Sequence, residues 1–432
     1  MLRNIAAGLC LLCAAAAASA PCEAREDIRF WHAMSGAQAL EMERLVARFN
    51  AAQREYRVVA SYKGPLEATF AAALGAKRSA GAPHIVQIHE ALTDDLIAEQ
   101  IVVPLWQVMA EAREPFAPTL LASVTGVFSD ERGRLLALPF TSTTPVLYYN
   151  RDALRRANLP ATPPATWYEL PAALEALYES GSSCPFTTAS PSWAMLENMS
   201  AWHNQEFATQ DNGIEGAGTR LAFNGRLLVR WIATLSTWRK SGYFVYSARA
   251  GEAEARFLAG ECALLTASSA SYPALRERAN FDLGVAPLPY YDDFDDAPQN
   301  TLAAGAPFWV LAGKPKSAYR GAAKFLAFLA RPQVQAEWQR RTGFVPFTLQ
   351  AYELARADGF YLKQPGQEIA MRQLIDKLPT EDSKAIRFAD LRRIRSIIDE
   401  ELDAVWLGKK APLDALNAAV ERGNELLSTT KR

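Results

Sequence analysis

Short apolar strands alternate with amphipathic helices from residue 28 onward, and this alternation restricts the fold more than any other feature. The pattern predicts strands at 28–34, 55–62 and 84–90, with helices at 39–53 and 67–80 between them. A strand followed by a helix and then by another strand favours a parallel sheet that helices cover on both faces. The first part of the chain is therefore expected to form an α/β lobe.

The same alternation returns in the second half of the chain. The segment 164–181 opens with Thr166 and Glu169, whose spacing is a capping-box signature for the start of a helix. Apolar residues at helical spacing continue in 224–242, and 262–268 is a short apolar strand. Because 432 residues are too many for one ordinary core, we predict two α/β lobes.

Residues 1–24 are typical of a cleavable secretory signal. An early arginine precedes an apolar stretch over residues 5–18, and small residues allow cleavage after Ala20 or Ala24. No later segment holds 18 apolar residues without a charge, so we expect no membrane span after cleavage. The sequence therefore predicts a secreted protein.

The cysteines divide between the signal and the remainder of the chain. Of the five, Cys10, Cys13 and Cys22 fall within the predicted signal, which leaves Cys184 and Cys262. Two cysteines in an oxidising compartment favour one disulfide. Two buried free thiols are the alternative, because sequence alone does not show that the two residues are close.

Composition and motifs exclude several classes of function. The formal net charge of -1 gives no electrostatic basis for binding nucleic acid or acidic membranes. The histidines do not form His-Glu-x-x-His, and no Gly-x-Ser-x-Gly, P-loop or Gly-x-Gly-x-x-Gly motif is present. The acidic run around Asp293 and Asp295 lacks the glycine and the distal glutamate of a calcium loop, so we interpret it as a solvated loop. We predict no enzymatic activity, no metal and no cofactor.

Hydroxyl side chains gather at two places that interrupt apolar segments. Thr141, Ser142, Thr143 and Thr144 are adjacent in the chain, and three serines follow the strand at 262–268. Helix N-termini and hydroxyl groups together favour the binding of an anion. β-propensity and ordinary helix caps are alternative explanations for the same residues. Taken together with the glycines of "LAAGAPFWV", the two clusters indicate an anion-binding cleft between the lobes.

Several longer segments together resemble one family of proteins. They are "PFTSTTPVLYYNRDAL", "PATWYEL", "FLAGECALLTASSAS", "DAPQN", "RTGFVP" and "IRSIIDEELDAVWLGKKAP". In these segments, which follow one another along the chain after the signal, the protein resembles the periplasmic sn-glycerol-3-phosphate-binding proteins of ABC importers. "PxTWxEL" is shared with the wider group of maltose-type solute-binding proteins, whereas "TASSAS" and "DAPQN" are more specific.

The resemblance implies an α/β, two-lobed periplasmic binding protein fold, in which three crossover segments form a hinge and the ligand lies between the lobes. The N-terminal lobe would contain residues 25–140 and 286–330, and the C-terminal lobe residues 141–285 and 331–432. The hydroxyl run at 141–144 would be the first crossover, with its side chains facing the cleft. The implied partners are a small glycerophosphoryl ligand and an inner-membrane ABC permease complex, and the protein would act as a monomer in the periplasm.

The resemblance also implies which residues contact the ligand. These positions are Leu66, Glu90, Thr143, Ser268, Gly305, Phe344 and Arg395, with an aromatic contribution from Trp167 or Trp193. Arg395 would anchor the phosphate through its planar fork, helped by the two hydroxyls and the glycine N–H, while Glu90 would accept from the glycerol hydroxyls. A surface ion pair with Glu400 or Asp399 on its own helix is the alternative for Arg395.

Three positions depart from the family pattern. The best-known members carry tyrosine where this chain has Leu66 and Phe344, and serine where it has Thr143. Loss of two phenol hydroxyls leaves two ligands open, sn-glycerol 3-phosphate or a glycerophosphodiester such as glycerophosphocholine, whose trimethylammonium group suits an aromatic face. Two further alternatives are an oligosaccharide-binding relative and a secreted hydrolase that uses Glu90 with a second carboxylate.

Overall fold

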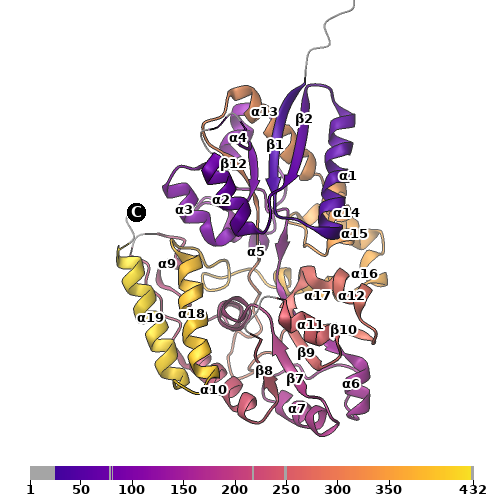
Figure 1. Cartoon of the computed structure of the whole chain (residues 1–432), viewed down its shortest axis with the longest axis vertical. Coiled ribbons are helices and arrows are strands. Elements are labelled where there is room, and N and C mark those ends of the chain that lie inside the picture. Colours follow the sequence, from indigo (N-terminus) through magenta and orange to yellow (C-terminus); the bar gives the residue numbers. More distant parts are fainter. Residues whose placement is uncertain (1–24, 77–78, 80, 217, 248–250, 430–432) are drawn as a thin grey trace, which may run out of the picture.

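The computed structural model describes residues 25–76, 79, 81–216, 218–247 and 251–429. The predicted signal at residues 1–24, with Cys10, Cys13 and Cys22, lies outside the described residues. Two lobes are visible in Figure 1, each built on its own sheet. Within the described part of the chain, no helix is both long enough and apolar enough to cross a membrane.

The first lobe is built on a sheet with strand order β2-β1-β3-β12-β4. Its strands are β1 (Glu26–His32), β2 (Tyr56–Tyr62), β3 (Ile85–Gln87), β4 (Val102–Val103) and β12 (Phe308–Leu311). The first three strands pair in parallel, as predicted, whereas β12 pairs antiparallel with both of its neighbours. The helices of this lobe are α1 (Gly36–Ala52), α2 (Leu66–Ala76), α3 (Thr93–Ala98), α4 (Leu105–Ala112), α13 (Lys316–Leu329) and α14 (Pro332–Thr342).

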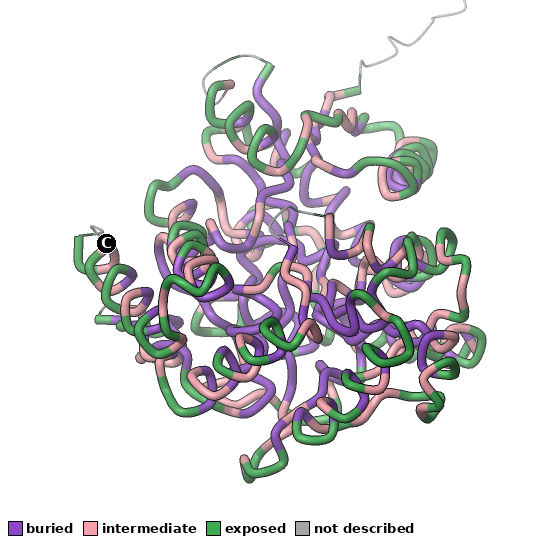
Figure 2. The backbone as a smooth tube through the Cα atoms, turned by 60° about the horizontal axis from the view of Figure 1, so that its bottom comes forward, coloured by how far each residue is buried: buried purple, intermediate pink, exposed green. Residues whose placement is uncertain are grey.

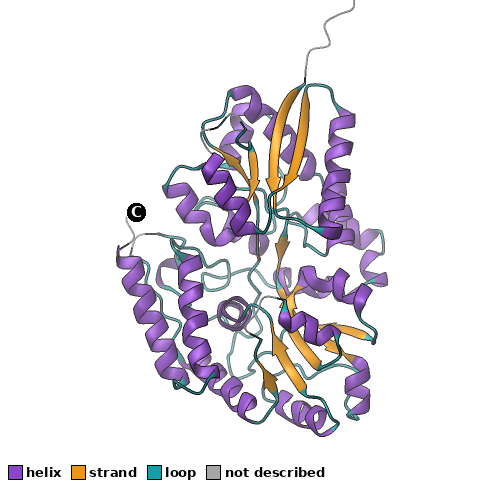
Figure 3. Ribbon diagram, in the orientation of Figure 1, coloured by secondary structure: helices purple, strands orange, loops and turns teal. Residues whose placement is uncertain are grey.

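The second lobe has a sheet of order β10-β6-β9-β7-β8. Its strands are β6 (Pro145–Asn150), β7 (Cys184–Thr188), β8 (Phe244–Val245), β9 (Cys262–Ser268) and β10 (Leu283–Ala286). Helices surround this sheet (Figure 3), and they are α6 (Arg151–Arg156), α7 (Leu170–Glu179), α8 (Asn198–Trp202), α10 (Arg226–Lys240), α11 (Glu252–Leu258), α12 (Tyr272–Arg278), α17 (Pro365–Ile375), α18 (Leu391–Trp406) and α19 (Pro412–Thr429). The predicted α/β, two-lobed class is confirmed, although β6 runs antiparallel to its neighbours and each sheet is therefore mixed.

Shorter elements join or cover the two lobes. They are α5 (Ala122–Thr125), α9 (Thr209–Asn212), α15 (Leu349–Ala357), α16 (Phe360–Lys363), the 3-10 helices η1 (Glu90–Leu92), η2 (Gly126–Phe128) and η4 (Ser269–Ser271), the π-helix η3 (Ser192–Glu197), and the strands β5 (Ser142–Thr143) and β11 (Ala304–Gly305). Buried residues gather in the middle of the molecule in Figure 2, and Ser142, Ala304 and Val345 of the joining segments are buried as well. The joining segments are therefore part of the packed structure.

Three chain segments lie side by side where the lobes meet. Strand β5 pairs antiparallel with β11, and Ser142 also forms a bridge with Val345. This arrangement agrees with the three-segment hinge that the family resemblance implies. Because β5, β11 and Val345 are far apart in the sequence, each lobe contains more than one stretch of the chain.

The crossings between the lobes fall later than the predicted boundaries at residues 286 and 331. After β10, the backbone N–H of Trp167 donates to the carbonyl of Tyr290, so the chain stays with the second lobe until β11. Helix α14 packs on α1 of the first lobe, where Arg48 and Glu337 form an ion pair at 2.6 Å. These contacts join residues far apart in sequence, so local patterns do not reveal them.

Most of the hydroxyl run stabilises the hinge instead of facing a cleft. Thr141, Ser142 and Thr144 are buried, and each hydroxyl donates to an oxygen of the crossover segments at 2.7 to 2.9 Å. The prediction that the whole run faces the cleft is therefore wrong for these three residues. Of these four residues, only Thr143 faces the space between the lobes.

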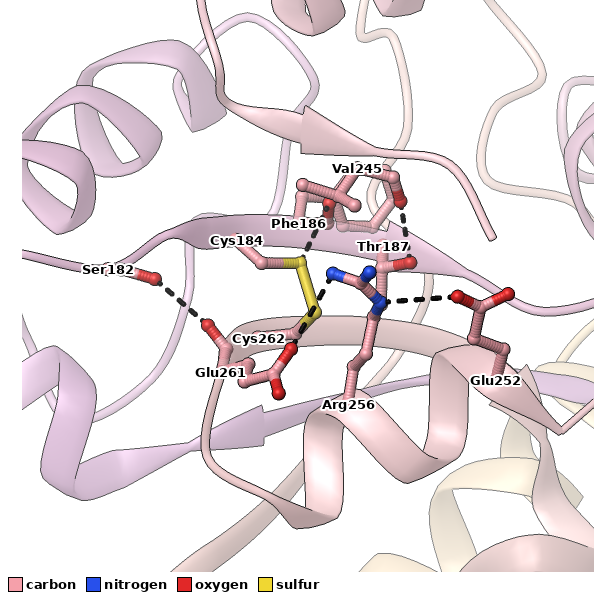
Figure 4. Close-up of a disulfide and its surroundings, with 9 residues drawn as sticks. All are labelled: Ser182, Cys184, Phe186, Thr187, Val245, Glu252, Arg256, Glu261 and Cys262. Carbon is pink, nitrogen blue, oxygen red and sulfur yellow. Dashed lines mark hydrogen bonds and ion pairs between the residues drawn. A yellow bond between two sulfur atoms is a disulfide. The ribbon is translucent and has the colours of Figure 1, made fainter. Parts of the chain in front are cut away.

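Cys184 and Cys262 form the predicted disulfide. They are paired neighbours on the parallel strands β7 and β9, and both are fully buried. Figure 4 shows Arg256 of α11 beside the bond, where it contacts Glu252 and Glu261. The disulfide therefore joins two central strands of the second sheet, far from the hinge.

Loss of this disulfide should destabilise the second lobe. It closes a loop of 78 residues, and a cross-link over a loop of that length restricts the unfolded chain. We expect the Cys184→Ala/Cys262→Ala variant to lose about 2–4 kcal/mol of unfolding free energy, measured by chemical denaturation. Reductant should destabilise the native protein but leave the double variant unchanged, and equal stability of the two proteins would contradict the prediction.

A side chain at position 305 should distort the hinge. Gly305 has a φ of +147°, and an added Cβ would lie 2.2 Å from the carbonyl oxygen of Thr141. We expect Gly305→Ala to cost about 2 kcal/mol or more, seen as a lower melting temperature. Gly75→Ala is the control, because a Cβ there would have no neighbour within 4 Å. An unchanged melting temperature for Gly305→Ala would mean that the hinge tolerates the strain.

Candidate ligand-binding site

A cavity of about 420 Å³ lies between the two lobes at the hinge. The first lobe contributes η1 and the start of α2, the hinge contributes β5 and β11, and the second lobe contributes the start of η3, the end of β9 and one face of α18. The lining residues are Glu67, His89, Glu90, Ala91, Thr143, Ser190, Ser192, Trp193, Ser268, Ala304, Gly305, Arg392, Arg395, Ser396 and Asp399.

Six of the nine predicted ligand-contact residues line this cavity. They are Glu90, Thr143, Trp193, Ser268, Gly305 and Arg395. They come from both lobes and from the hinge, and they are separated by up to 305 positions in the chain. The structure therefore brings together residues that the family resemblance selects on sequence alone.

The guanidinium of Arg395 is held by two buried carboxylates. Its Nε and Nη2 atoms donate to the two oxygens of Glu197 at 2.6 and 2.8 Å, and Nη1 donates to Glu90 Oε1 at 2.9 Å. Burial alone would lower the pKa of Arg395, but Glu197 and Glu90 outweigh burial and raise it. The alternative of a surface ion pair on its own helix is wrong, because both partners come from other segments.

Glu90 of the first lobe accepts hydrogen bonds from both the hinge and the second lobe. Its Oε2 atom accepts from the Gly305 N–H at 3.2 Å and lies 2.8 Å from His89 Nδ1, while Oε1 accepts from Arg395. Burial alone would raise the pKa of the Glu90 carboxyl, but His89 and Arg395 lower it to about 2. The carboxylate is therefore ionised at neutral pH.

The hydroxyls of Thr143 and Ser268 form one cluster at the hinge. Their oxygens lie 2.5 Å apart, and Thr143 Oγ1 lies 2.9 Å from the hydroxyl of Ser269. The Ala270 N–H donates to both Thr143 and Ser268, so Ser268 is the cap of η4 as well as part of the cavity wall. Ser268 therefore caps η4, as an ordinary helix cap does, and also faces the cavity, as an anion-binding residue would.

The other three predicted contact residues lie outside the cavity lining. Trp167 is 2% exposed and packs in the core of the second lobe, with its ring 4.2 Å from that of Trp231, so of the two alternative tryptophans only Trp193 lines the cavity. Phe344 stacks on Trp338 at 6.0 Å. Leu66 is half-buried at the start of α2, where the next residue, Glu67, lines the cavity.

Sequence reasoning missed several lining residues. Arg392, Ser396 and Asp399 share the face of α18 that carries Arg395, and helical spacing alone could have identified them. Glu197 approaches Arg395 from η3, and no local pattern distinguishes it from a surface glutamate. Among the described residues, no group of three or more His, Cys, Asp or Glu side chains is placed to hold a metal ion.

A second cavity, of about 640 Å³, is lined by residues of the second lobe and of the segment that precedes β11. Its walls come from the segment 162–165, strand β10 and helix α17, and none of the nine predicted ligand-contact residues lines it. The interlobe cavity is therefore the candidate ligand site.

Comparisons with known proteins agree with this architecture. Residues 44–363 match the family model for bacterial extracellular solute-binding protein. The chain is 43% identical over 412 residues to the sn-glycerol-3-phosphate-binding periplasmic protein UgpB of Yersinia enterocolitica, covering 95% of this chain and 94% of that protein. It is 44% identical over 408 residues to the UgpB protein of Escherichia coli O1:K1, covering 94% and 93% of the two chains.

Solved structures share the fold at lower identity. UgpB from Mycobacterium tuberculosis in complex with glycerophosphocholine superposes with a TM-score of 0.76 at 18% identity, covering 93% of this chain and 98% of that one. The cyclic alpha-maltosyl-1,6-maltose binding protein from Arthrobacter globiformis has a TM-score of 0.76 at 19% identity, covering 94% and 100%. The chain therefore belongs to the bacterial extracellular solute-binding protein family, and its resemblance to the sn-glycerol-3-phosphate-binding periplasmic proteins is confirmed.

Proposed function

We propose that this protein is the periplasmic substrate-binding component of an ABC importer, capturing sn-glycerol 3-phosphate, glycerophosphodiesters or both for a membrane permease. The observation that carries the proposal is the position of Arg395 in the interlobe cavity beside Thr143 and Ser268. Curated relatives with 43–44% identity are named for binding sn-glycerol 3-phosphate in the periplasm, which supports the same ligand class. The protein is proposed to act as a monomer that binds and releases its ligand unchanged.

Arg395 is suited to hold a phosphate group in a fixed direction. A guanidinium has five N–H donors, and three of them are engaged by Glu197 and Glu90, which leaves two for a ligand. The bidentate contact with Glu197 fixes the plane of the fork before a ligand arrives. Thr143 and Ser268 add hydroxyl donors on the hinge side of the same cavity.

The hydrogen bonds of Gly305 and Glu90 support roles that differ from those the resemblance implies. The Gly305 N–H donates to Glu90, so it would have to leave that partner to reach a phosphate. Glu90 holds Arg395 with one oxygen and the Gly305 N–H with the other, so its first role is to position these groups. A carboxylate oxygen accepts more than one hydrogen bond, and Glu90 therefore remains able to accept from a glycerol hydroxyl as well.

A captured ligand would stabilise the contact between the two lobes. Glu90 belongs to the first lobe and Arg395 to the second, and a ligand that touches both favours the arrangement in which the lobes meet. Two further contacts join the segment just before α18 to the first lobe: Arg387 pairs with Asp94, and the Asp390 N–H donates to Asp95. The permease would then recognise the ligand-stabilised arrangement.

The test is a calorimetric titration of the mature protein with sn-glycerol 3-phosphate. Arg395→Lys keeps the charge but loses the fork, and should weaken binding about 10- to 100-fold. Ser268→Ala should weaken binding less, about 5- to 10-fold. Arg393→Lys is the matched control, since its side chain is 65% exposed and outside the cavity lining, and it should bind like the native protein.

Melting temperatures separate a binding defect from misfolding in these variants. Binding of sn-glycerol 3-phosphate that is equally strong in native protein and in folded Arg395→Lys would contradict the assigned site. If the native protein binds maltose and no glycerophosphoryl compound, the oligosaccharide-binding alternative replaces the proposal.

A further inference from the structure

The larger cavity, of about 640 Å³, has the size and the lining of a small-molecule site. Sites of about 300–1,000 Å³ with mostly apolar walls and a few polar groups are typical for small ligands. The polar residues of the lining are Thr162, Gln299, Arg372, Gln373, Asp376 and Lys377, and every other described lining residue is aliphatic, aromatic or proline. This cavity shares no residue with the interlobe cavity.

Hydrogen bonds fix the walls of this cavity in place. Helix α17 packs beside β10, the edge strand of the second sheet (Figure 1). Gln373 of α17 is 3% exposed, and its side chain accepts from the Leu288 N–H at 2.7 Å and donates to the Pro145 carbonyl at 2.8 Å. The indole N–H of Trp202 donates to the Leu288 carbonyl at 3.0 Å. Since these buried groups are satisfied by one another, the cavity is formed before a ligand enters.

One buried acceptor of the lining is left for a ligand. The backbone N–H of Gln299 donates to the Trp202 carbonyl at 2.8 Å, but the Oε1 atom of Gln299 is buried and has no hydrogen-bond partner among the described residues. A buried acceptor gains free energy from an N–H or O–H donor. The prolines of the lining have no N–H to supply, and they are Pro163, Pro164, Pro287 and Pro298.

The ionised side chains of the lining favour a ligand with one negative charge. They are Arg372, Asp376 and Lys377, and all three are exposed. Arg372 Nε donates to Asp376 at 3.1 Å, so these two charges offset each other. Lys377 Nζ donates to the carbonyl of Asp296 at 3.1 Å, which leaves its charge without compensation from that partner. Two cations and one carboxylate therefore leave one positive charge at the lining.

We propose that this cavity is a second ligand site, which binds aromatic monocarboxylates that carry one N–H or O–H donor. The aromatic ring would lie among Trp202, Tyr290 and the prolines, the donor would bond to Gln299, and the carboxylate would lie near Lys377. The inference goes beyond the proposed function and does not depend on it.

The experiment uses three probes of nearly the same shape in calorimetric titrations of the mature protein at pH 7.5. Indole-3-acetate has both the charge and the donor, indole-3-acetamide lacks the charge, and benzofuran-3-acetate lacks the donor. We expect saturable binding of indole-3-acetate. The amide should bind about fivefold more weakly because it loses the attraction of the lysine, and the benzofuran about fivefold more weakly because it loses one hydrogen bond.

Two variants place the binding in this cavity. Ile369→Trp fills part of the cavity and should weaken indole-3-acetate at least about 10-fold. Leu362→Trp is the matched control, because Leu362 is 90% exposed and outside the lining, and it should bind like the native protein. Lys377→Gln changes an exposed side chain and should weaken indole-3-acetate about threefold, without an effect on the amide.

Melting temperatures show whether Ile369→Trp is folded, and Lys377→Gln decides the outcome if it is not. The proposal is overturned if native protein shows no saturable binding of indole-3-acetate, or if the acid and the amide bind equally. Native-like binding by folded Ile369→Trp, or by Lys377→Gln, would overturn it as well. A dimer of the native protein that Ile369→Trp abolishes would assign the cavity to a second copy of the chain instead.

Discussion

The buried ion pairs of Arg395 are the interaction on which the cavity depends. This arginine links Glu197 of the second lobe to Glu90 of the first, and Glu90 in turn accepts from the hinge at Gly305. Removing one partner of such a network typically costs about 3–5 kcal/mol, because a charge is left buried without compensation. The site is therefore built before a ligand enters, with its cation fixed in position and largely neutralised.

The hinge complements this network by presenting few groups to the cavity. Most hydroxyls of the run at 141–144 are bonded within the crossover segments, and Thr143 alone lines the cavity beside Ser268. Buried hydroxyls that are fully hydrogen-bonded hold backbone segments in one arrangement. The consequence is a junction of defined backbone geometry that presents one cluster of hydroxyl donors to the cavity, flanked by lobes that supply the charged groups.

Local patterns predicted much of this protein, and long-range packing decided the rest. Alternating strands and helices predicted two α/β lobes. Thr166 and Glu169 form part of the predicted capping box, because the Glu169 N–H donates to the Thr166 hydroxyl, but α7 begins only at Leu170. Trp167 and Trp193 look alike in sequence, and only the tertiary packing puts one in the core and the other at the cavity. The sequence did not indicate that Glu197 belongs to the site, because its partner Arg395 lies 198 positions away in the chain.

The central claim is that a phosphate group binds in the interlobe cavity at Arg395. A crystal structure of the mature protein grown with a glycerophosphoryl ligand tests it most directly. The account predicts phosphate oxygens within hydrogen-bond distance of Arg395 and of the Thr143 and Ser268 hydroxyls. A ligand bound in the larger cavity of the second lobe, or one whose phosphate points away from Arg395, would contradict the account.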